Sequence, residues 1–590
     1  MPAYDKLRLY TSDEAFVLQP ATGADIVLFI DRVNHSMQPR SARDVEAQMH
    51  AGVTREVAAL LGVIHLLAGP YLLLITKKQL VGRLAGSDIF KATEIEMIPF
   101  ARSHRHLSEA QSADEKSYVA MINSMLASGA FHFSYSYDLT HTQQRLYTDD
   151  KQFAHQAMHE RADERFYWNK YLHQAFRDSR DLRDFLVPVI HGFVSINQLN
   201  VKDRSLQFVL ISRRSVYRSG TRFNVRGIDE SGHVANFVET EQIVEVNGQA
   251  ASYVQTRGSV PLFWSQRANI KYKPSIVVNT DADHFSAFRK HFDEQQRIYG
   301  KSQGLLSLVD HKGGELRLHE GFAQQVVMAG DTGLRFIGFD FHKECKNMKY
   351  QNLKKLLDQI AGDMEKQGYF FIDNNKAVRH RQNGVFRTNC ADCLDRTNVV
   401  QSMIARLVLQ RQLQELGVIA PGELVEQQVE LERRFKNVWA DNADAVSFQY
   451  SGTGALKTDF TRTGKRSLAG AMQDGYNSAI RYYKNNFADG FRQDGVALFL
   501  GTYRVDPQVD SPLREVAKRL RMLPLISAVV FAMLVLSLMF PATDDSVLHV
   551  AYVLFWVLAL VVSIRTIVTY GNEFVDHPRL TSFSVKEKIF

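Results

Sequence analysis

The sequence contains little cysteine and no internal repeat. Only three cysteines, Cys345, Cys390 and Cys393, occur among 590 residues. They are too few and too unevenly spaced for the disulfide framework of a small secreted protein. The first residues also lack the basic and then apolar pattern of a signal peptide. We therefore expect the N-terminal bulk of the chain to lie in a reducing compartment, on the cytosolic side of any membrane.

Neither charge sign is in large excess. The chain has 71 Lys and Arg against 64 Asp and Glu, a formal net charge of +7. This mild bias suits anionic partners, either membrane phosphates or nucleic acid, without selecting one of them. With 45% apolar residues, a chain of this length can bury two or three separate cores.

Long uncharged runs are concentrated near the C-terminus. Residues 523–540 and 547–564 are each eighteen residues long and carry no charge. Each run is about long enough to cross a membrane as a helix, and the short connection permits only an antiparallel hairpin. Basic residues flank the pair, whereas its loop holds Asp544 and Asp545, so both ends are predicted to be cytosolic. The flanking residues are Arg514, Lys518, Arg519, Arg521, Arg565, Arg579, Lys586 and Lys588. The alternative is a hairpin buried in a soluble core.

A third uncharged run, Val57 to Ile75, is predicted to be different. It contains His65 and the break Ala68-Gly69-Pro70, which is typical of two buried strands around a turn. We do not expect it to span a membrane.

The remaining chain alternates strand-like and helical segments, which predicts an α/β region with two parts. Residues 1–183 are expected to form a mixed, β-rich subdomain with a helical stretch around Ala154 to Tyr171. Residues 184–504 are expected to form an α/β catalytic subdomain, with helices at 349–366 and 398–416. The other predicted segments are a juxtamembrane linker (505–521), two transmembrane helices (522–540 and 547–568), a lumenal loop (541–546) and a cytosolic tail (569–590).

The densest polar stretch, RTNCADCLDRTN at 387–398, predicts phosphate chemistry. Cys390 and Arg396 are separated by five residues, between a strand-like GVFR and a predicted helix. A loop of this length can aim backbone N–H groups at an anion at the helix N-terminus. Arg396 can bind two phosphate oxygens, and such a site lowers the pKa of Cys390 so that its thiolate can attack phosphorus. Thr397 can donate a hydrogen bond to the departing thiolate.

Two carboxyl groups of the loop could protonate the leaving oxygen. We favour Asp392, two residues after the nucleophile, whereas Asp395 could instead cap the following helix. Other interpretations of the stretch are a zinc site built on Cys390 and Cys393, or a thioredoxin-like redox pair. Neither explains Arg396 and Thr397.

The stretch 387–398 resembles the catalytic loop of the Sac-domain phosphoinositide phosphatases, which reads Arg-x-Asn-Cys-x-Asp-Cys-Leu-Asp-Arg-Thr-Asn. Residues 387–398 match it in full, and further similar stretches lie at 166–172, 212–229, 257–266, 339–345 and 450–467. The resemblance implies a Sac subdomain followed by a catalytic one, and a cysteine mechanism that needs no metal or other cofactor. Integral membrane members of the endoplasmic reticulum and Golgi act chiefly on phosphatidylinositol 4-phosphate, and also on the 3-phosphate.

The expected substrate site comprises the catalytic loop and a basic segment after it. The catalytic residues are Cys390, Arg396, Asp392 and Thr397, and the expected substrate-binding residues are Ala391, Cys393, Leu394, Asp395, Lys457, Arg462 and Lys465. The basic segment could equally be a solvated loop. A second arginine-rich segment, from Arg213 to Arg226, could guide an anionic head group or alternate out of a strand.

The predicted function is therefore hydrolysis of a phosphoinositide by a membrane-anchored enzyme, with no nucleic-acid partner. A phosphoinositide-binding tether with negligible turnover and a protein tyrosine phosphatase are the alternatives. Lys586 and Lys588 lie fifth and third from the last residue of the sequence. This spacing resembles a dilysine retrieval signal, which implies binding to coat-protein retrieval machinery and residence in the endoplasmic reticulum, with cycling through the Golgi.

Overall fold

The computed structural model describes residues 2–149, 153, 155–346, 349–513, 520, 522–540 and 546–580. A small antiparallel sheet with the order β4-β3-β2-β1-β5 begins the chain. Its strands are β1 (Leu7–Thr11), β2 (Ala15–Pro20), β3 (Ile26–Asp31), β4 (Met37–Ser41) and β5 (Val53–Val57), with α1 (Glu46–Ala51) beside them. The inward side chains of this sheet share a core with β6 and β7.

A long sheet runs through both predicted subdomains, in the order β17-β16-β20-β13-β12-β11-β10-β9-β8-β7-β6. The first part of its chain comprises β6 (Ala59–Leu66), β7 (Gly69–Leu84), β8 (Ser87–Pro99), β9 (Phe131–Phe133), β10 (Ile190–Val201), β11 (Arg204–Arg214), β12 (Val238–Val246) and β13 (Gln249–Arg257). The second part comprises β16 (Ser302–Ser307), β17 (Leu334–Gly338), β18 (Phe370–Ile372), β19 (Val378–His380) and β20 (Gly384–Asn389). The strands β18 and β19 extend from β13.

The predicted boundary at residue 183 falls inside this continuous sheet. Strands β9 and β10 pair across it, with Ile190 opposite His132. The run Val57 to Ile75 forms the antiparallel strands β6 and β7, as predicted. The helical stretch expected from 154 to 171 is wrong: its described part contains one short helix, α5 (Met158–Arg161), and otherwise turns.

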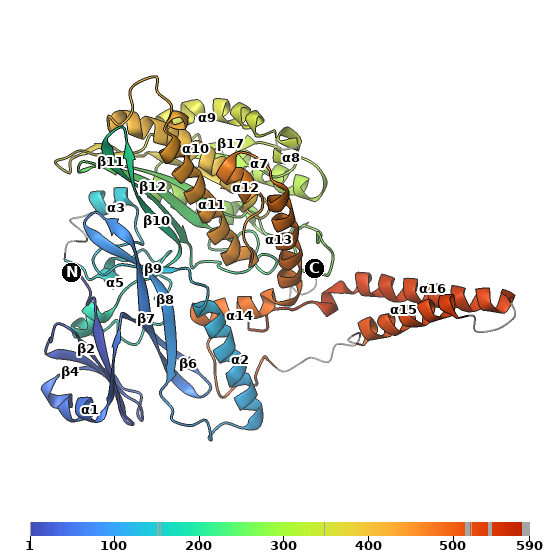
Figure 1. Ribbon diagram of the computed structural model, residues 1–590, viewed down its shortest axis with the longest axis horizontal. Helices are drawn as coiled ribbons and strands as arrows, with labels where there is room; N and C mark the ends of the chain where they lie inside the picture. The colour runs from blue at the N-terminus through green and yellow to red at the C-terminus, as the bar shows by residue number, and fades with distance from the viewer. Residues whose placement is uncertain are drawn as a thin grey trace.

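Helices cover the catalytic half of the sheet, in the upper part of Figure 1. They are α6 (His284–Tyr299), α7 (Leu316–Ala329), α8 (Phe341–Glu344), α9 (Leu353–Gln367), α10 (Asp395–Glu415), α11 (Val429–Ser451), α12 (Thr458–Thr463) and α13 (Leu468–Phe487). Helix α10 packs Ile404 and Leu409 against the sheet in two adjoining cores. The helix predicted at 398–416 from its apolar spacing is therefore confirmed. The Ser467 hydroxyl caps α13 by accepting a hydrogen bond from the Gly470 N–H at 2.9 Å.

Helix α14 (Asp489–Phe499) packs against α2 (Glu109–Leu126) of the N-terminal part. Its Val496, Leu498 and Phe499 belong to the same core as Tyr118 and Trp168. The predicted catalytic segment 184–504 therefore ends with a helix that packs into the other subdomain.

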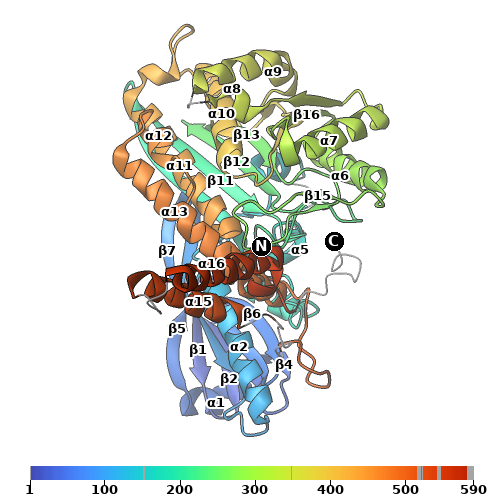
Figure 2. The ribbon, with the colours of Figure 1, turned by 90° about the vertical axis from the view of Figure 1, so that its right-hand side faces the viewer.

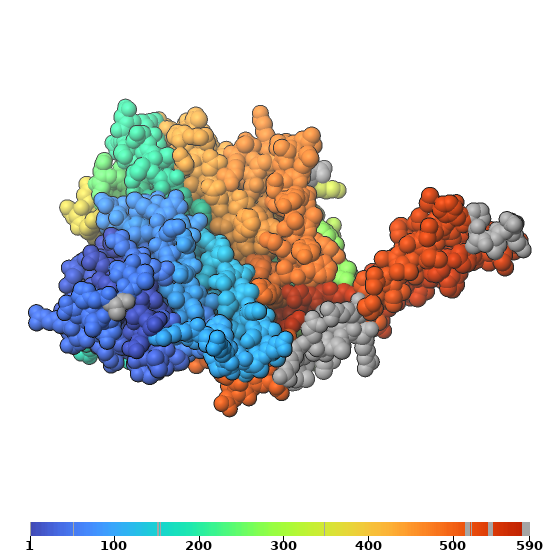
Figure 3. Space-filling model, turned by 60° about the horizontal axis from the view of Figure 1, so that its bottom comes forward, coloured from blue at the N-terminus to red at the C-terminus, as the bar shows by residue number. Residues whose placement is uncertain are grey.

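Two apolar helices, α15 (Leu523–Met539) and α16 (Ser546–Thr569), lie side by side and project from the body. Figure 3 shows this arm extending beyond the body. Residues Val547–Thr569 are long and apolar enough to cross a membrane, whereas α15 has 17 residues, about 25 Å against a hydrocarbon core of about 30 Å. The described residues thus contain one candidate membrane helix, and the prediction of two spans is not confirmed. The linker residues Arg514, Lys518, Arg519 and Arg521, the loop 541–545 and Lys586 and Lys588 lie outside the described residues.

The chain returns to the body after α16. Val575 is buried with Phe223 and Ala268, and the Asp576 carboxylate accepts a hydrogen bond from the Phe491 N–H at 2.9 Å. The guanidinium of Arg579, predicted to flank a span, instead binds the Leu513 carbonyl at 2.7 Å. Residues up to 580 of the predicted tail are therefore part of the folded body.

Candidate active site

The catalytic loop lies where the parallel part of the long sheet ends. Strand β20 pairs in parallel with β16 and β13, and α10 begins at Asp395. The predicted order of strand, loop and helix is confirmed. Ligands of open α/β sheets bind beyond the carboxyl ends of the strands, and Cys390 is the first residue there.

Cys390 is buried, and its sulfur is surrounded by donors from its own loop. The Cys393 N–H donates a hydrogen bond to Cys390 Sγ at 2.9 Å, and the Thr397 hydroxyl lies 3.6 Å from the same sulfur. Cys393 adopts a left-handed φ of +55°, which turns its N–H back toward the nucleophile. The Cys393 thiol itself donates to the Gly258 carbonyl at 2.9 Å. One backbone N–H of the loop, that of Cys393, is thus directed at the Cys390 sulfur; the prediction that several N–H groups surround a bound anion stays a prediction.

This environment favours a thiolate at Cys390. Burial alone raises the pKa of a thiol, but the hydrogen bond with Cys393 and the charge of Arg396 outweigh burial and lower the pKa of Cys390. Burial and the neighbouring Cys390 raise the pKa of Cys393. The thiolate form is thus favoured at Cys390 and disfavoured at Cys393. All three cysteines are free, and the described residues contain no group of three or more His, Cys, Asp or Glu that could hold a metal ion.

Asp392 is held by two arginines that reach the loop from outside. Arg222 binds both its carboxylate oxygens, at 3.0 and 2.7 Å, and Arg226 binds one at 2.7 Å. Arg226 also donates to the Ala391 carbonyl at 2.7 Å. Burial alone would raise the pKa of Asp392, but the two guanidinium groups hold it far below its ordinary value. Asp392 therefore braces the loop and is a poor proton donor, so the preference for Asp392 over Asp395 is revised.

Asp395 has a different environment, at the first position of α10. Its Oδ1 accepts a hydrogen bond from the Leu456 N–H at 2.8 Å, and its Oδ2 lies 3.5 Å from Arg481. It does not cap its own helix in the expected way. Asp395 lines the same cleft as Cys390.

Arg396 binds two carboxylates in this structure. Its guanidinium makes a two-pronged pair with Glu315, at 3.0 and 2.9 Å, and donates to the Leu308 carbonyl at 2.9 Å. Asp310 lies 3.4 Å away and binds His342 at 2.7 Å. To bind a phosphate with the same two prongs, Arg396 has to leave Glu315.

A cleft of about 1030 Å³ opens over the loop and contains Cys390, Asp395 and Arg396 in its wall. Of the three predicted basic contacts, Lys457 lies in this wall, whereas Arg462 and Lys465 do not. Arg462 instead pairs with Asp441 at 2.8 Å. Further cationic wall residues that no sequence motif indicated are Lys273, Lys312, Arg317 and Arg481. They come from distant segments with no shared motif, although Gly313 and Gly314 next to Lys312 were a signal of a tight turn.

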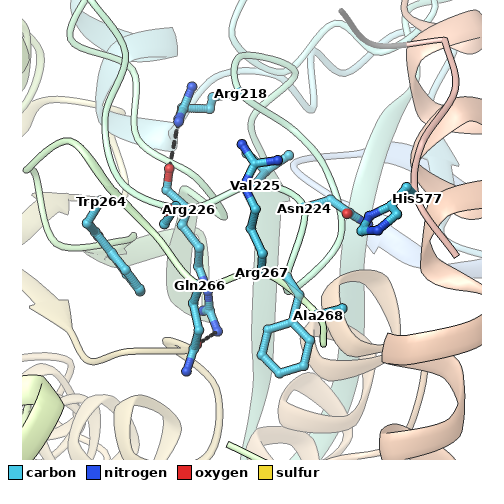
Figure 4. A pocket seen from close by; sticks show the side chains of 11 residues that line it. Arg218, Asn224, Val225, Arg226, Trp264, Gln266, Arg267, Ala268 and His577 are labelled. Carbon is cyan, nitrogen blue, oxygen red and sulfur yellow. Dashed lines mark hydrogen bonds between the residues drawn. The ribbon is translucent and has the colours of Figure 1, made fainter. Parts of the chain in front are cut away.

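A smaller pocket of about 140 Å³ lies behind the arginine brace (Figure 4). In this view Arg226 and Gln266 point toward each other, joined by a hydrogen bond of 2.7 Å. His577, from the segment after α16, forms the opposite wall beside Asn224. His577, from the segment that follows the apolar hairpin, therefore lines the same pocket as Arg226, one of the two arginines that bind Asp392.

A protein-family model described as the SacI homology domain matches residues 58–346. Phosphatidylinositol-3-phosphatase SAC1-A of Danio rerio is 46% identical over 590 residues, which cover 100% of this chain and 99% of the relative. The chain belongs to the Sac-domain phosphoinositide phosphatase family. Phosphatidylinositol-3-phosphatase SAC1 is 43% identical in Drosophila melanogaster, over 98% of this chain and 97% of the relative. In Saccharomyces cerevisiae it is 36% identical, over 94% and 90%.

Family membership confirms the resemblance to the Sac-domain phosphoinositide phosphatases. The family model ends at residue 346, before the Cys390 loop, whereas the Danio rerio relative covers the whole chain. The region aligned with this relative thus extends over residues 387–398 and the apolar hairpin.

Proposed function

We propose that this protein removes the 4-phosphate, and also the 3-phosphate, from phosphatidylinositol phosphates through a cysteinyl-phosphate on Cys390. The observation that carries the proposal is the position of Cys390 in the wall of the cleft, with Arg396 and Thr397 in the first turn of α10. Relatives named phosphatidylinositol-3-phosphatase support the substrate class.

In the first step, the Cys390 thiolate attacks phosphorus, the sulfur–phosphorus bond forms, and the bond from phosphorus to the inositol oxygen breaks. Arg396 moves from Glu315 to two phosphoryl oxygens, and the Cys393 N–H is released to an oxygen of the phosphoryl group. In the second step, water attacks phosphorus, the sulfur–phosphorus bond breaks, and the water proton passes to the carboxylate that protonated the inositol oxygen in the first step, so that inorganic phosphate and the thiolate separate. The Thr397 hydroxyl, already 3.6 Å from the sulfur, stabilises the departing thiolate.

The inositol oxygen needs a proton as it leaves, and we assign this role to Asp395. Asp395 lines the cleft and has one arginine near its carboxylate, Arg481 at 3.5 Å, whereas the carboxylate of Asp392 is bound by two arginines at 2.7 Å. The pH dependence of kcat tests the assignment. Asp395→Asn should remove the alkaline limb of the profile, and an unchanged limb contradicts the role.

Phosphate release from phosphatidylinositol 4-phosphate tests the whole proposal. Cys390→Ser should abolish release, because a serine hydroxyl stays protonated at neutral pH. Cys345→Ser is the matched control: Cys345 is also buried and free, and burial raises its pKa to about 11. Equal release by wild type and Cys390→Ser contradicts the mechanism. The 3- and 5-phosphates assayed side by side test the positional preference.

A binding tether with little turnover has one observation in its favour, the engagement of Arg396 by Glu315. A tether should bind phosphatidylinositol 4-phosphate equally in wild type and Cys390→Ser, with no release from either. A protein tyrosine phosphatase should prefer a phosphopeptide in the same assay.

We further propose that α15 and α16 both cross the endoplasmic reticulum membrane, with the two chain ends cytosolic. The apolar composition of both helices and the return of residues 571–580 to the body support this topology. Lys586 and Lys588, as a retrieval signal, would return the protein from the Golgi. Replacing both by serine should move a fluorescent fusion to the Golgi, and unchanged reticular staining contradicts the signal.

A further inference from the structure

Helix α13 has two faces with different surroundings. One face contributes Ser478, Arg481, Tyr482 and Asn485 to the wall of the catalytic cleft. Arg481 is anchored there by the Gly454 carbonyl at 2.9 Å and the Ser447 hydroxyl at 3.0 Å. This face fixes the helix to the site.

The opposite face is exposed and apolar. Leu468, Met472, Tyr476 and Tyr483 are 80%, 70%, 63% and 59% exposed, and their spacing of four, four and seven residues places them on one side of the helix. The three charged residues of α13 are not fully exposed: Asp474 pairs with Arg466, Lys484 binds the Gly452 carbonyl, and Arg481 is buried. A helix surrounded by water normally carries its charges on its exposed face, and a contiguous apolar face marks an interaction surface.

Helix α13 lies on the side of the molecule from which the apolar hairpin projects. Figure 1 places α13 on the hairpin side of the catalytic half, and Figure 2, viewed from that side, shows α13 and α16 turned toward the viewer. Tyr272, 69% exposed, lies at the cleft side of α13, with its ring 6.5 Å from that of Tyr482. Lys273 and Lys457 stand at the adjoining cleft wall.

We propose that the exposed face of α13, formed by Leu468, Met472, Tyr476 and Tyr483, docks into the bilayer surface and holds the mouth of the cleft at the lipid head groups. This inference rests on the proposed function. A bilayer is the occupant because apolar and tyrosine side chains next to lysines match an interfacial layer of acyl chains and anionic head groups. The candidate membrane helix α16 is part of the same chain, so its insertion would bring a bilayer close to the body.

Lipid-borne quenching measures the docking directly. In the full-length Cys390→Ser chain, whose other two cysteines are buried, Met472→Cys carries an environment-sensitive fluorophore and the protein is reconstituted into vesicles. Quenchers attached near the lipid head groups should quench this label at least about threefold more than the same label at Val33→Cys. Val33 is 75% exposed and follows β3, in the N-terminal sheet away from the hairpin.

Equal quenching at the two positions overturns the proposal. A blue-shifted label that lipid-borne quenchers do not reach, and whose shift grows with the density of protein in the vesicles, indicates that a second copy covers the face, and also overturns it. Because this chain carries Cys390→Ser, the result does not depend on catalysis, and failure of docking is distinguishable from failure of the proposed function.

Activity provides the second test. The double variant Met472→Asp/Tyr476→Asp should lower release from phosphatidylinositol 4-phosphate in vesicles by about tenfold, because a charged side chain resists transfer into the bilayer surface. Release from a water-soluble short-chain analogue should stay within about twofold of wild type, since the cleft is untouched. Val33→Asp/Val53→Asp, at residues 75% and 76% exposed, is the matched control. Equal losses on both substrates, or a vesicle rate equal to that of the control, contradict docking.

Discussion

The two sides of the catalytic loop are both held by ion pairs, but the pairs have opposite consequences. On one side, Arg222 and Arg226 bind the Asp392 carboxylate. On the other side, Glu315 binds Arg396. The Asp392 pairs shape the loop without using any group that the reaction needs. The Glu315 pair occupies the guanidinium that has to bind phosphate.

The difference teaches that burial and pairing do not by themselves separate structural from functional charges. A pair that braces the site has to persist through turnover, because losing it leaves a buried charge unpaired. A pair that occupies a substrate-binding group has to be exchanged for substrate. The two sides should therefore respond to charge-neutralising variants in opposite directions.

The largest effect is expected at the ion pairs of Asp392 with Arg222 and Arg226. Asp392→Asn removes the partner of Arg226, whose side chain is 2% exposed, and should cost about 3 kcal/mol of unfolding free energy. Displacement of the loop should also lower kcat by about 100-fold, evenly across pH. Calorimetry and phosphate release check both effects. A loss confined to the alkaline limb of the pH profile would instead restore Asp392 as the proton donor.

Asp441→Asn provides the control for this variant. Asp441 pairs with Arg462 at 2.8 Å, but both side chains are substantially exposed. Surface pairs contribute about 0–1 kcal/mol. Stability and kcat should therefore remain close to wild type.

A smaller and opposite effect is expected on the other side of the loop. Glu315→Gln keeps the shape of the side chain but weakens the pair that engages Arg396, so an anion competes more easily for the guanidinium. Inhibition by orthovanadate, a phosphate mimic, should become about tenfold tighter, which corresponds to about 1.4 kcal/mol. Glu320→Gln, on the exposed side of α7, should leave inhibition unchanged. Weaker inhibition of Glu315→Gln shows that the pair positions Arg396 productively.

The sequence predicted the loop well because its information is local. Cys390, Arg396 and Thr397 are adjacent in the chain, and the strand and helix around them have clear periodic patterns. Arg222 and Arg226 were visible only as an arginine-rich segment, since their partner Asp392 lies 170 and 166 residues further along the chain. Glu315 gave no signal at all. Pairings over such separations are set by the assembled sheet, which no local pattern encodes.

The apolar hairpin shows the same limit in another form. Composition predicted two apolar segments, and both are helices. It did not predict that α15 would have only 17 residues, or that residues 571–580 would return to the body and place Val575 against Phe223. Hydropathy indicates that a segment is unfavourable in water. The residues at which a helix ends, and the return of a segment to the body, depend instead on specific contacts.

The smallest effect distinguishes the two sides through the nucleophile itself. The charge of Asp392 raises the pKa of Cys390, while that of Arg396 lowers it. Arg222→Met removes one of the cations that offset Asp392, so the pKa of Cys390 should rise by about one unit. Glu315→Gln removes a carboxylate from beside Arg396, so the pKa should stay or fall. The rate of iodoacetamide alkylation against pH measures both shifts.

The sign of the stability effect follows from the same titration. Since the folded state lowers the pKa of Cys390, ionisation of this thiol stabilises the fold above the unfolded value of about 8.5, and that contribution is lost as pH falls through the folded value. Arg222→Met should reduce the difference between the folded and unfolded pKa values of Cys390, whereas Glu315→Gln should leave this difference unchanged or increase it. Shifts of the same sign in both variants would mean that the two sides of the loop do not act separately.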